Sequence, residues 1–270
     1  MPSSDSCDGG HSSRDVAMWR FGAIGLAGGL ASGMFGVGGG IVIVPLLVLV
    51  GHLDQRQASA TSLLAIVPTA ATGAAFFAAH GDLALVPGVI VGIGAIAGAW
   101  AGARILRIIK LAALRWAFVG LLAGVAGWMA LYVPSRGAQM DLSPAIGAGM
   151  AGLGLVMGLT ASLFGIGGGV IAVPALMGLF GASDLVARGT SLLIMVPAAI
   201  TGATAGVRAG IAEVRPGLVT GLCAALASWG GGALAGLLSP RAGNLLFAAL
   251  LAISAAGRAG GGWRASPPTP

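Results

Sequence analysis

The sequence predicts an all-α polytopic membrane protein built from two inverted repeats, each with a glycine-broken helical hairpin plus spanning helices. The chain is strongly apolar, because 57% of its 270 residues are hydrophobic and only 8% are charged, whereas a soluble domain carries about a quarter charged residues. Apolar runs recur at bilayer-spanning length, and the two halves of the chain resemble each other. We therefore expect about 8 to 10 helical segments.

The internal repeat holds its register without a gap. The run Phe35–Gly40 reads FGVGGG and the run Phe164–Gly169 reads FGIGGG, 129 residues later. The same spacing relates further pairs: Pro45 and Pro174, Thr61-Ser62 and Thr190-Ser191, Pro68 and Pro197, Pro87-Gly88 and Pro216-Gly217, Trp100 and Trp229. A repeat of about a hundred residues is a duplicated half rather than a solenoid unit.

Taken in order, the elements divide the chain into five parts. We expect a disordered polar tail over 1–15, a first membrane repeat over 16–110, a linking transmembrane helix and loop over 111–144, a second membrane repeat over 145–239, and a last transmembrane helix and tail over 240–270. Single spans are predicted at Ala58–Ala79, Leu83–Ala103, Leu111–Val133, Val186–Val207, Val214–Leu238 and Ala242–Ala256. The longer stretches Val16–Val50 and Ala145–Phe180 carry the glycine runs near their centres.

The basic residues indicate topology rather than a nucleic-acid partner, because the net charge of +6 is scattered among the connections between apolar runs. If each glycine-centred stretch folds back as a hairpin, 11 of the 14 basic residues are cytoplasmic, together with both termini; a single crossing gives 7 on each side. The charge distribution thus favours the hairpin. The lone span Leu111–Val133 then places equivalent points of the two repeats on opposite faces, the arrangement of alternating-access transporters.

The glycine runs predict a substrate site. Consecutive glycines destabilise a helix by about 1 kcal/mol each relative to alanine, so we expect an open turn inside the bilayer. The helix that starts at such a turn offers unpaired amides and a positive dipole end to an anion. The alternative is that the glycines serve only close helix packing. The candidate substrate-binding residues of the turns are Gly36, Gly38, Gly39, Gly40, Gly165, Gly167, Gly168 and Gly169.

Polar side chains near the turns complete the candidate site. The hydroxyls of Thr61, Ser62, Thr190 and Ser191 either cap helix starts or line a polar cavity. Arg208 is the further candidate, although Arg188 and Arg208 both lie near predicted helix ends, where snorkelling to the surface is the ordinary interpretation. We predict no metal and no cofactor, because Cys7 and Cys223 do not pair and the polar residues of the first tail do not form a fixed cluster.

Both glycine signatures, with Ala60-Thr61-Ser62 and Gly189-Thr190-Ser191 downstream, resemble the TauE/SafE-type sulfite exporters, also described as four-toluene-sulfonate-uptake-type permeases, over residues 20–256. The resemblance implies a multi-pass bacterial inner-membrane transporter for sulfite, sulfonates or related organosulfur anions, coupled to a proton or ion gradient. An anion channel and a permease for an unrelated small organic anion stay open as alternatives, as does a homodimer. An enzyme is not expected, because all eight acidic residues lie in tails or connections.

Overall fold

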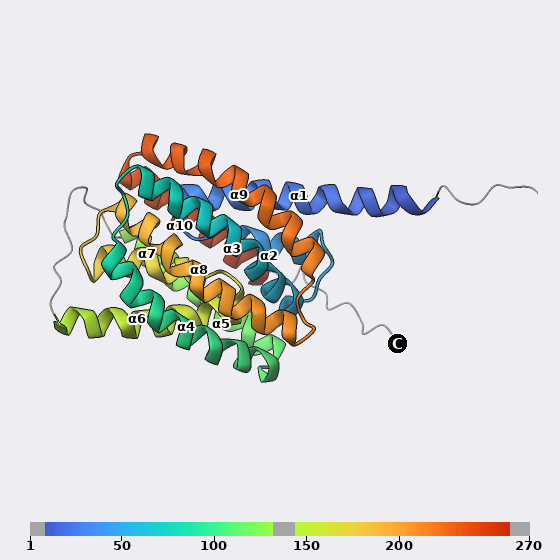
Figure 1. The fold of residues 1–270 in the computed structure, drawn as a ribbon, viewed down its shortest axis with the longest axis horizontal. Coiled ribbons are helices and arrows are strands. Elements are labelled where there is room, and N and C mark those ends of the chain that lie inside the picture. The colour runs from blue at the N-terminus through green and yellow to red at the C-terminus, as the bar shows by residue number, and fades with distance from the viewer. Residues whose placement is uncertain (1–8, 132–143, 260–270) are drawn as a thin grey trace, which may run out of the picture.

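A computed structural model describes residues 9–131 and 144–259, which are organised as ten α-helices (Figure 1). In chain order these are α1 (Gly9–Phe35), α2 (Gly40–Leu49), α3 (Gln55–Ala79), α4 (Leu85–Ile108), α5 (Leu111–Leu131), α6 (Pro144–Phe164), α7 (Gly169–Gly178), α8 (Asp184–Arg208), α9 (Val214–Leu237) and α10 (Pro240–Ala259). Six of them, α3, α4, α5, α6, α8 and α9, are long and apolar enough to cross a membrane. The prediction of an all-α polytopic membrane protein is confirmed.

The glycine runs break the chain into two helical hairpins. Gly39 and Gly168 adopt left-handed conformations, with φ of 73° and 82°, directly before α2 and α7. Helix α2 then returns along α1, because a Cβ placed on Gly28 would lie 2.4 Å from Ile43, and one placed on Gly51 would lie 3.1 Å from the Phe21 ring. In the second hairpin a Cβ on Gly149 would lie 4.0 Å from the Phe180 ring, so both glycine stretches fold back on themselves.

Helix caps set where the two central helices start. Asp54 precedes α3 and accepts a hydrogen bond from the amide of Gln57 at 2.8 Å, while the Gln57 side chain accepts one from the Asp54 amide at 3.2 Å. Before α8, the Ser183 hydroxyl accepts from the amide of Val186 at 3.4 Å. Because these caps satisfy the free amides of the first turn, both helices start two to three residues before the apolar runs by which they are recognised in the sequence.

Helices α3 and α8 occupy equivalent places in the two repeats and pack against each other in opposite directions. A Cβ on Gly73 would lie 2.8 Å from Leu192, and a Cβ on Gly202 would lie 2.7 Å from Leu63. Early residues of one helix thus meet late residues of the other. Equivalent helices of the two repeats are antiparallel at the centre of the bundle.

The first helix of each hairpin packs on the other repeat. Helices α1 and α9 lie side by side, as do α4 and α6 (Figure 1). Gly29 lies against the backbone of Ala224, and Gly98 against the backbone of Leu155, at distances that leave no room for a side chain. Small residues allow membrane helices to approach this closely. The repeats are therefore interlocked rather than two bundles joined side by side.

Helices α5 and α10 also start 129 residues apart, at Leu111 and Pro240, and pack on each other. Phe118 of α5 lies 5.3 Å from the ring of Phe164, and Phe247 of α10 lies 5.3 Å from the ring of Phe35. Each ring thus packs on the residue that precedes a glycine turn. Helix α5, which was expected to link the two repeats, is thus the last helix of the first repeat, as α10 is the last helix of the second.

Two boundaries differ from expectation or lie outside the description. Helix α1 starts at Gly9, so residues 9–15 belong to the helix and not to the tail over 1–15; extending a formed helix through a few polar residues costs little. The loop expected after α5 and the final residues of the C-terminal tail lie outside the described residues.

Candidate functional site

The two glycine turns meet at the centre of the molecule. A Cβ on Gly40 would lie 2.5 Å from the Cα of Ile166, and a Cβ on Gly169 would lie 2.6 Å from the Cα of Val37. All residues from 36 to 40 and from 165 to 169 are buried. The structure thus brings together the eight glycines predicted as substrate-binding residues, although they come from positions 129 apart in the chain.

Each turn carries a run of backbone amides that bond to no acceptor in the part of the chain that the structure describes. The φ angles of Gly36, Gly38 and Gly39 are 71°, 67° and 73°, and their equivalents in the second turn have 69°, 73° and 82°. Within the described residues, no acceptor is recorded for the amides of Val37, Gly38 and Gly39, or for their equivalents Ile166, Gly167 and Gly168. A buried unpaired amide costs about 1 to 3 kcal/mol, and successive amides in such a turn form an anion-binding nest.

A serine from the opposite repeat holds each turn. Ser62 of α3 donates to the carbonyl of Gly165 at 2.6 Å, and Ser191 of α8 donates to the carbonyl of Gly36. Both serines are fully buried. Their hydroxyls take up the carbonyl side of the turns, so the amide side is left available for a ligand. Ser62 and Ser191 therefore position the turns.

One methionine and one isoleucine fill the space beside both turns. A Cβ on Gly38 would lie 2.2 Å from the terminal methyl of Met195, and a Cβ on Gly167 would lie 2.1 Å from the same methyl. Ile66, the equivalent of Met195 at 129-residue spacing, would lie 3.2 Å and 3.3 Å from the same two Cβ positions. The flexible thioether side chain thus occupies the junction of the turns, a role that the sequence analysis missed.

The two predicted threonines have other partners. The Thr61 hydroxyl accepts a hydrogen bond from the amide of Glu213 at 2.9 Å, and the Thr190 hydroxyl accepts one from the amide of Ala84 at 3.0 Å. Glu213 and Ala84 are the residues directly before α9 and α4. These hydroxyls were expected either to cap helix starts or to line a polar cavity. In the structure each one accepts a hydrogen bond at the start of a neighbouring helix, which is the capping role.

We therefore expect Thr61→Val to lower protein stability rather than anion affinity. The substitution removes the part-buried hydrogen bond from the Glu213 amide, a loss of about 0.5 to 1.5 kcal/mol. Thr204→Val is the matched control, because the exposed Thr204 hydroxyl donates only within its own helix, at 2.8 Å to Ile200. Thermal unfolding in detergent measures both. A weakened anion affinity with unchanged unfolding temperature for Thr61→Val would contradict this assignment.

Arg208 is not brought to the turns. It is exposed in the last turn of α8, 17 residues after Ser191, which is about 25 Å along a helix. Arg188, for which snorkelling to the surface is the ordinary interpretation, is instead buried: 3% of its surface is exposed. Its backbone lies against the first turn, since a Cβ on Gly36 would be 2.5 Å from the Arg188 Cα.

The guanidinium of Arg188 supports the end of α1. Its Nη1 donates to the carbonyl of Met34 at 2.7 Å, and its Nη2 lies 3.8 Å from Asp184, which is 1% exposed. In the first repeat Ser59 and Gln55 occupy the equivalent positions, and the Ser59 hydroxyl donates to the carbonyl of Phe164 at 3.2 Å. Comparing the repeats at 129-residue spacing would have singled out this charged pair in the sequence.

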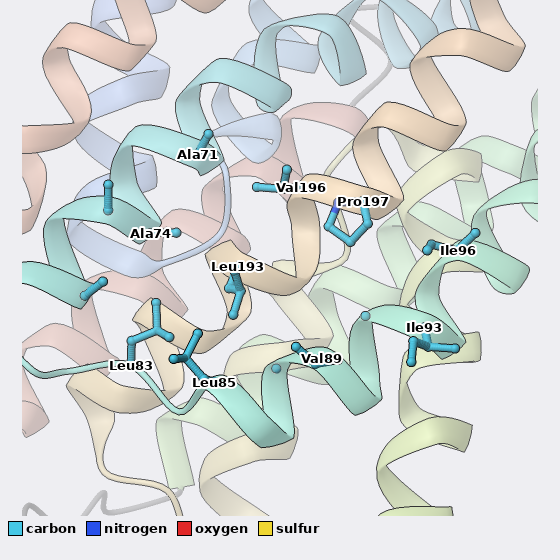
Figure 2. A pocket seen from close by; sticks show the side chains of 14 residues that line it. Ala71, Ala74, Leu83, Leu85, Val89, Ile93, Ile96, Leu193, Val196 and Pro197 are labelled. Atoms are coloured by element: carbon cyan, nitrogen blue, oxygen red, sulfur yellow. The ribbon is translucent and has the colours of Figure 1, made fainter.

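A large groove elsewhere does not suit an anion. It has a volume of about 530 Å³ and lies between α3, α4 and α8, and Figure 2 shows Leu193, Val196 and Pro197 facing Val89 and Ile93 across it. Every lining residue is apolar or a glycine. The buried serines Ser62 and Ser191 and the amides of Val37–Gly39 and Ile166–Gly168 lie at the turns instead. We therefore place the candidate site at the turns.

A polytopic helical bundle in which two broken hairpins meet at a buried set of amides defines a membrane transport protein. The family model of the sulfite exporter TauE/SafE matches residues 4–129 and 150–265. The chain belongs to this family.

Curated relatives agree with the assignment. The chain is 28% identical over 177 residues to the probable membrane transporter protein YdhB of Bacillus subtilis, covering 64% of this chain and 72% of the relative. It is 28% identical over 203 residues to YunE of the same organism, also named a probable membrane transporter protein, covering 66% and 74%. A shorter match, 29% over 121 residues, is to the probable membrane transporter protein MamO of Paramagnetospirillum magneticum, covering 40% of this chain and 18% of the relative. No solved structure matches.

Proposed function

We propose that this protein is a secondary transporter that carries small sulfur-containing anions, sulfite or sulfonates, across the bacterial inner membrane by alternating access. The observation that carries the proposal is the pair of buried amide runs at Val37–Gly39 and Ile166–Gly168, which have no acceptor among the described residues. A bound oxyanion would satisfy several of them at once. The family description supplies the expected class of anion.

The neutrality of the turns suits a transported ligand. A site built from amides binds an anion without an opposite full charge, so release costs less than from an ion pair. The nearest basic residue, Arg188, is engaged with Met34 and Asp184. For the anion to bind, the Met195 side chain has to move away from the glycines, which its flexibility permits.

The antiparallel packing of α3 and α8 supports the alternating-access part of the proposal. Equivalent helices that run in opposite directions give two related conformations, one open to each face. In the proposed orientation both termini and the basic connection around Arg104, Arg107 and Lys110 face the cytoplasm. Coupling to protons or another ion and assembly as a homodimer belong to the same proposal. The role is transport and not catalysis.

Ligand-dependent stability and flux test this function. Purified protein in detergent is heated with sulfite, thiosulfate, sulfoacetate, sulfate or chloride. A ligand at 100 times its Kd stabilises the folded state by about 2.7 kcal/mol, which raises the unfolding temperature. We expect a rise with sulfite or a sulfonate and none with chloride at equal ionic strength.

Flux into proteoliposomes separates the remaining classes. Saturable uptake that follows an imposed gradient supports a carrier, whereas uptake that keeps rising with concentration indicates a channel. Stabilisation by a carboxylate alone would indicate a permease for an unrelated organic anion. If no anion stabilises the protein and none is transported, the proposed function is wrong.

A further inference from the structure

A cationic hollow lies at one end of the bundle. It has a volume of about 450 Å³ and is lined by Asp54, Arg56, Gln57, Arg107, Ala209, Gly210 and Ile211; we call it the vestibule. The carboxylate of Asp54 is engaged in the cap of α3. The two arginines donate to backbone carbonyls, Arg56 to Ile109 at 2.6 Å and Arg107 to Ala205 at 3.4 Å. The Nε of Arg56 is buried, and no residue within 9–131 or 144–259 pairs with it.

A second, narrower cavity continues from the vestibule toward the glycine turns. It shares Arg107, Ala209 and Ile211 with the vestibule and ends beside Leu63 and Ser162. Its volume of about 10 Å³ holds about one water molecule. Ser162 is 1% exposed, and its buried hydroxyl has no hydrogen-bond partner among the described residues. Ser162 lies in the last turn of α6, three residues before Gly165, and its hydroxyl faces α8, 2.8 Å from a Cβ placed on Gly202.

The equivalent place in the other half is filled by aromatic rings. At 129-residue spacing, Ala205 and Gly206 of the narrow cavity correspond to Phe76 and Phe77. A Cβ on Gly232 would lie 2.5 Å from the ring of Phe76, and a Cβ on Gly189 would lie 2.6 Å from the Cβ of Phe77. The repeats are thus alike in backbone, but two phenyl rings occupy the space that a methyl group and a glycine leave open.

The rings form part of a packed cluster. The ring of Phe76 lies 5.5 Å from Phe77, 5.6 Å from Trp229 and 4.3 Å from His80. Aromatic contacts at these distances stabilise one another beyond the area they bury. The closure of this side is therefore built from mutually supporting side chains.

We propose that small anions reach the glycine turns through the vestibule and the cavity beside Ser162, and that Phe76 and Phe77 close the equivalent route from the other end. The two guanidinium groups of Arg56 and Arg107 collect the anion, and the Ser162 hydroxyl donates to it at the inner end of the narrow cavity. The route is narrow in this conformation, so entry requires a small outward movement of α8 against α4. The identity of the ligand rests on the proposed function, whereas the difference between the two routes does not.

Cysteine labelling tests the route. In a background with Cys7→Ser and Cys223→Ser, Leu63→Cys reports on the open route. Leu192→Cys, its equivalent behind the phenylalanines, is the matched control. The probe is sulfonatoethyl methanethiosulfonate, a small anionic thiol reagent that does not cross membranes. In vesicles of both orientations, we expect Leu63→Cys to react from the vestibule face at least about tenfold faster than Leu192→Cys reacts from either face, because labelling follows access to the thiol.

Two further variants reverse the pattern. Phe76→Ala with Phe77→Ala should make Leu192→Cys reactive from the face opposite the vestibule, and Ala205→Phe should stop the labelling of Leu63→Cys. Complete labelling after denaturation and an unchanged elution volume control for reactivity and folding. Should the Phe76 and Phe77 variant misfold, the Ala205→Phe variant still decides. Equal labelling of the two cysteines, or continued labelling in Ala205→Phe, would overturn the inference.

The labelling experiment also distinguishes an error in the proposed ligand from an error in the proposed route. Excess sulfite should slow the labelling of Leu63→Cys if the anion uses this route. Arg56→Gln with Arg107→Gln should slow the anionic reagent but not the neutral hydroxyethyl reagent. If sulfite gives no protection while the difference between Leu63→Cys and Leu192→Cys persists, the route is right and the ligand is wrong. If the difference is absent, the route is wrong whatever the ligand.

Discussion

Gly38→Ala is expected to weaken the affinity of the protein for its anion about tenfold to a hundredfold, whereas Gly181→Ala leaves transport intact. The two glycines have nearly the same φ, 67° and 68°, so alanine costs each position a similar strain of about 1 to 2 kcal/mol. A Cβ on Gly181 meets nothing within 4 Å, but one on Gly38 would lie 2.2 Å from the Met195 methyl. At Gly38 the new methyl group stands at the junction of the turns.

The size of the loss follows from the hydrogen bonds at stake. Each amide bond to a charged ligand contributes about 1.5 to 3 kcal/mol, so losing one lowers affinity about tenfold to a hundredfold. The measurement is radiolabelled sulfite uptake in proteoliposomes, with the protein amount and the unfolding temperature determined in parallel. Gly167→Ala, at the equivalent position of the second turn, should behave as Gly38→Ala does.

A double variant separates blocked binding from poor packing. Gly38→Ala with Met195→Ala removes the methyl that the new Cβ meets, so it relieves the clash while the alanine still covers the amides. Transport should stay as weak in the double variant as in Gly38→Ala. Recovered transport would show that the single substitution acted through packing, and the anion site would then have to be sought elsewhere.

Much of the helical order could be predicted from the chain, since hydropathy and the 129-residue register both report on local structure. Helix α5 begins at Leu111 and α9 at Val214, as expected from the apolar runs. The fold-back of the glycine stretches followed from the distribution of arginines. Helix positions and the fold-back depend on whether short runs of residues are apolar or charged, and this can be read from the sequence.

The partners of individual polar groups could not be predicted in this way. The Thr61 hydroxyl accepts a hydrogen bond from the amide of Glu213, which is 152 residues away in the chain. Which helix of the second repeat lies beside Thr61 depends on the interlocked packing of α1 with α9. Arg208 and Arg188 both lie near the ends of α8. Arg208 is exposed, whereas Arg188 is buried because α1 and α10 cover it. Helix ends look alike until the tertiary contacts are known.

Asymmetry between the repeats was present in the sequence but is informative only with the structure. Phe76 and Phe77 oppose Ala205 and Gly206 at 129-residue spacing. Without the fold, this difference reads as ordinary variation of apolar residues in a membrane helix. The structure places one pair beside a cavity and the other in its filled counterpart.

Arg188→Ser is expected to destabilise the protein by about 3 to 5 kcal/mol, since removing one member of a buried ion pair leaves the other charge uncompensated. Asp184 is 1% exposed and lies 3.8 Å from the Arg188 guanidinium. The substitution also removes the hydrogen bond from Arg188 to the carbonyl of Met34. Thermal unfolding in detergent should show a large drop in unfolding temperature for the single variant.

The first repeat provides the matched control for this pair. Its equivalent residues are Gln55 and Ser59, which are buried without charge at the corresponding turn. Asp184→Gln with Arg188→Ser therefore gives the second repeat the side chains that already fold in the first, and removing both charges together avoids an unpaired one. We expect the double variant to recover most of the lost stability. A double variant as unstable as Arg188→Ser would show that Arg188 stabilises the fold through its contact with α1 and not through Asp184.

Transport by the double variant then decides whether the charge of Arg188 serves the anion. The guanidinium supports the carbonyl end of α1 directly before the first turn, and its positive charge adds to the potential at amides that have no acceptor among the described residues. If this charge contributes to binding, the folded double variant should have a raised half-saturation concentration for sulfite, by about tenfold for a contribution of about 1.4 kcal/mol. An unchanged half-saturation concentration would confine Arg188 to holding α1, and the amides of the two turns alone would then account for the attraction of the anion.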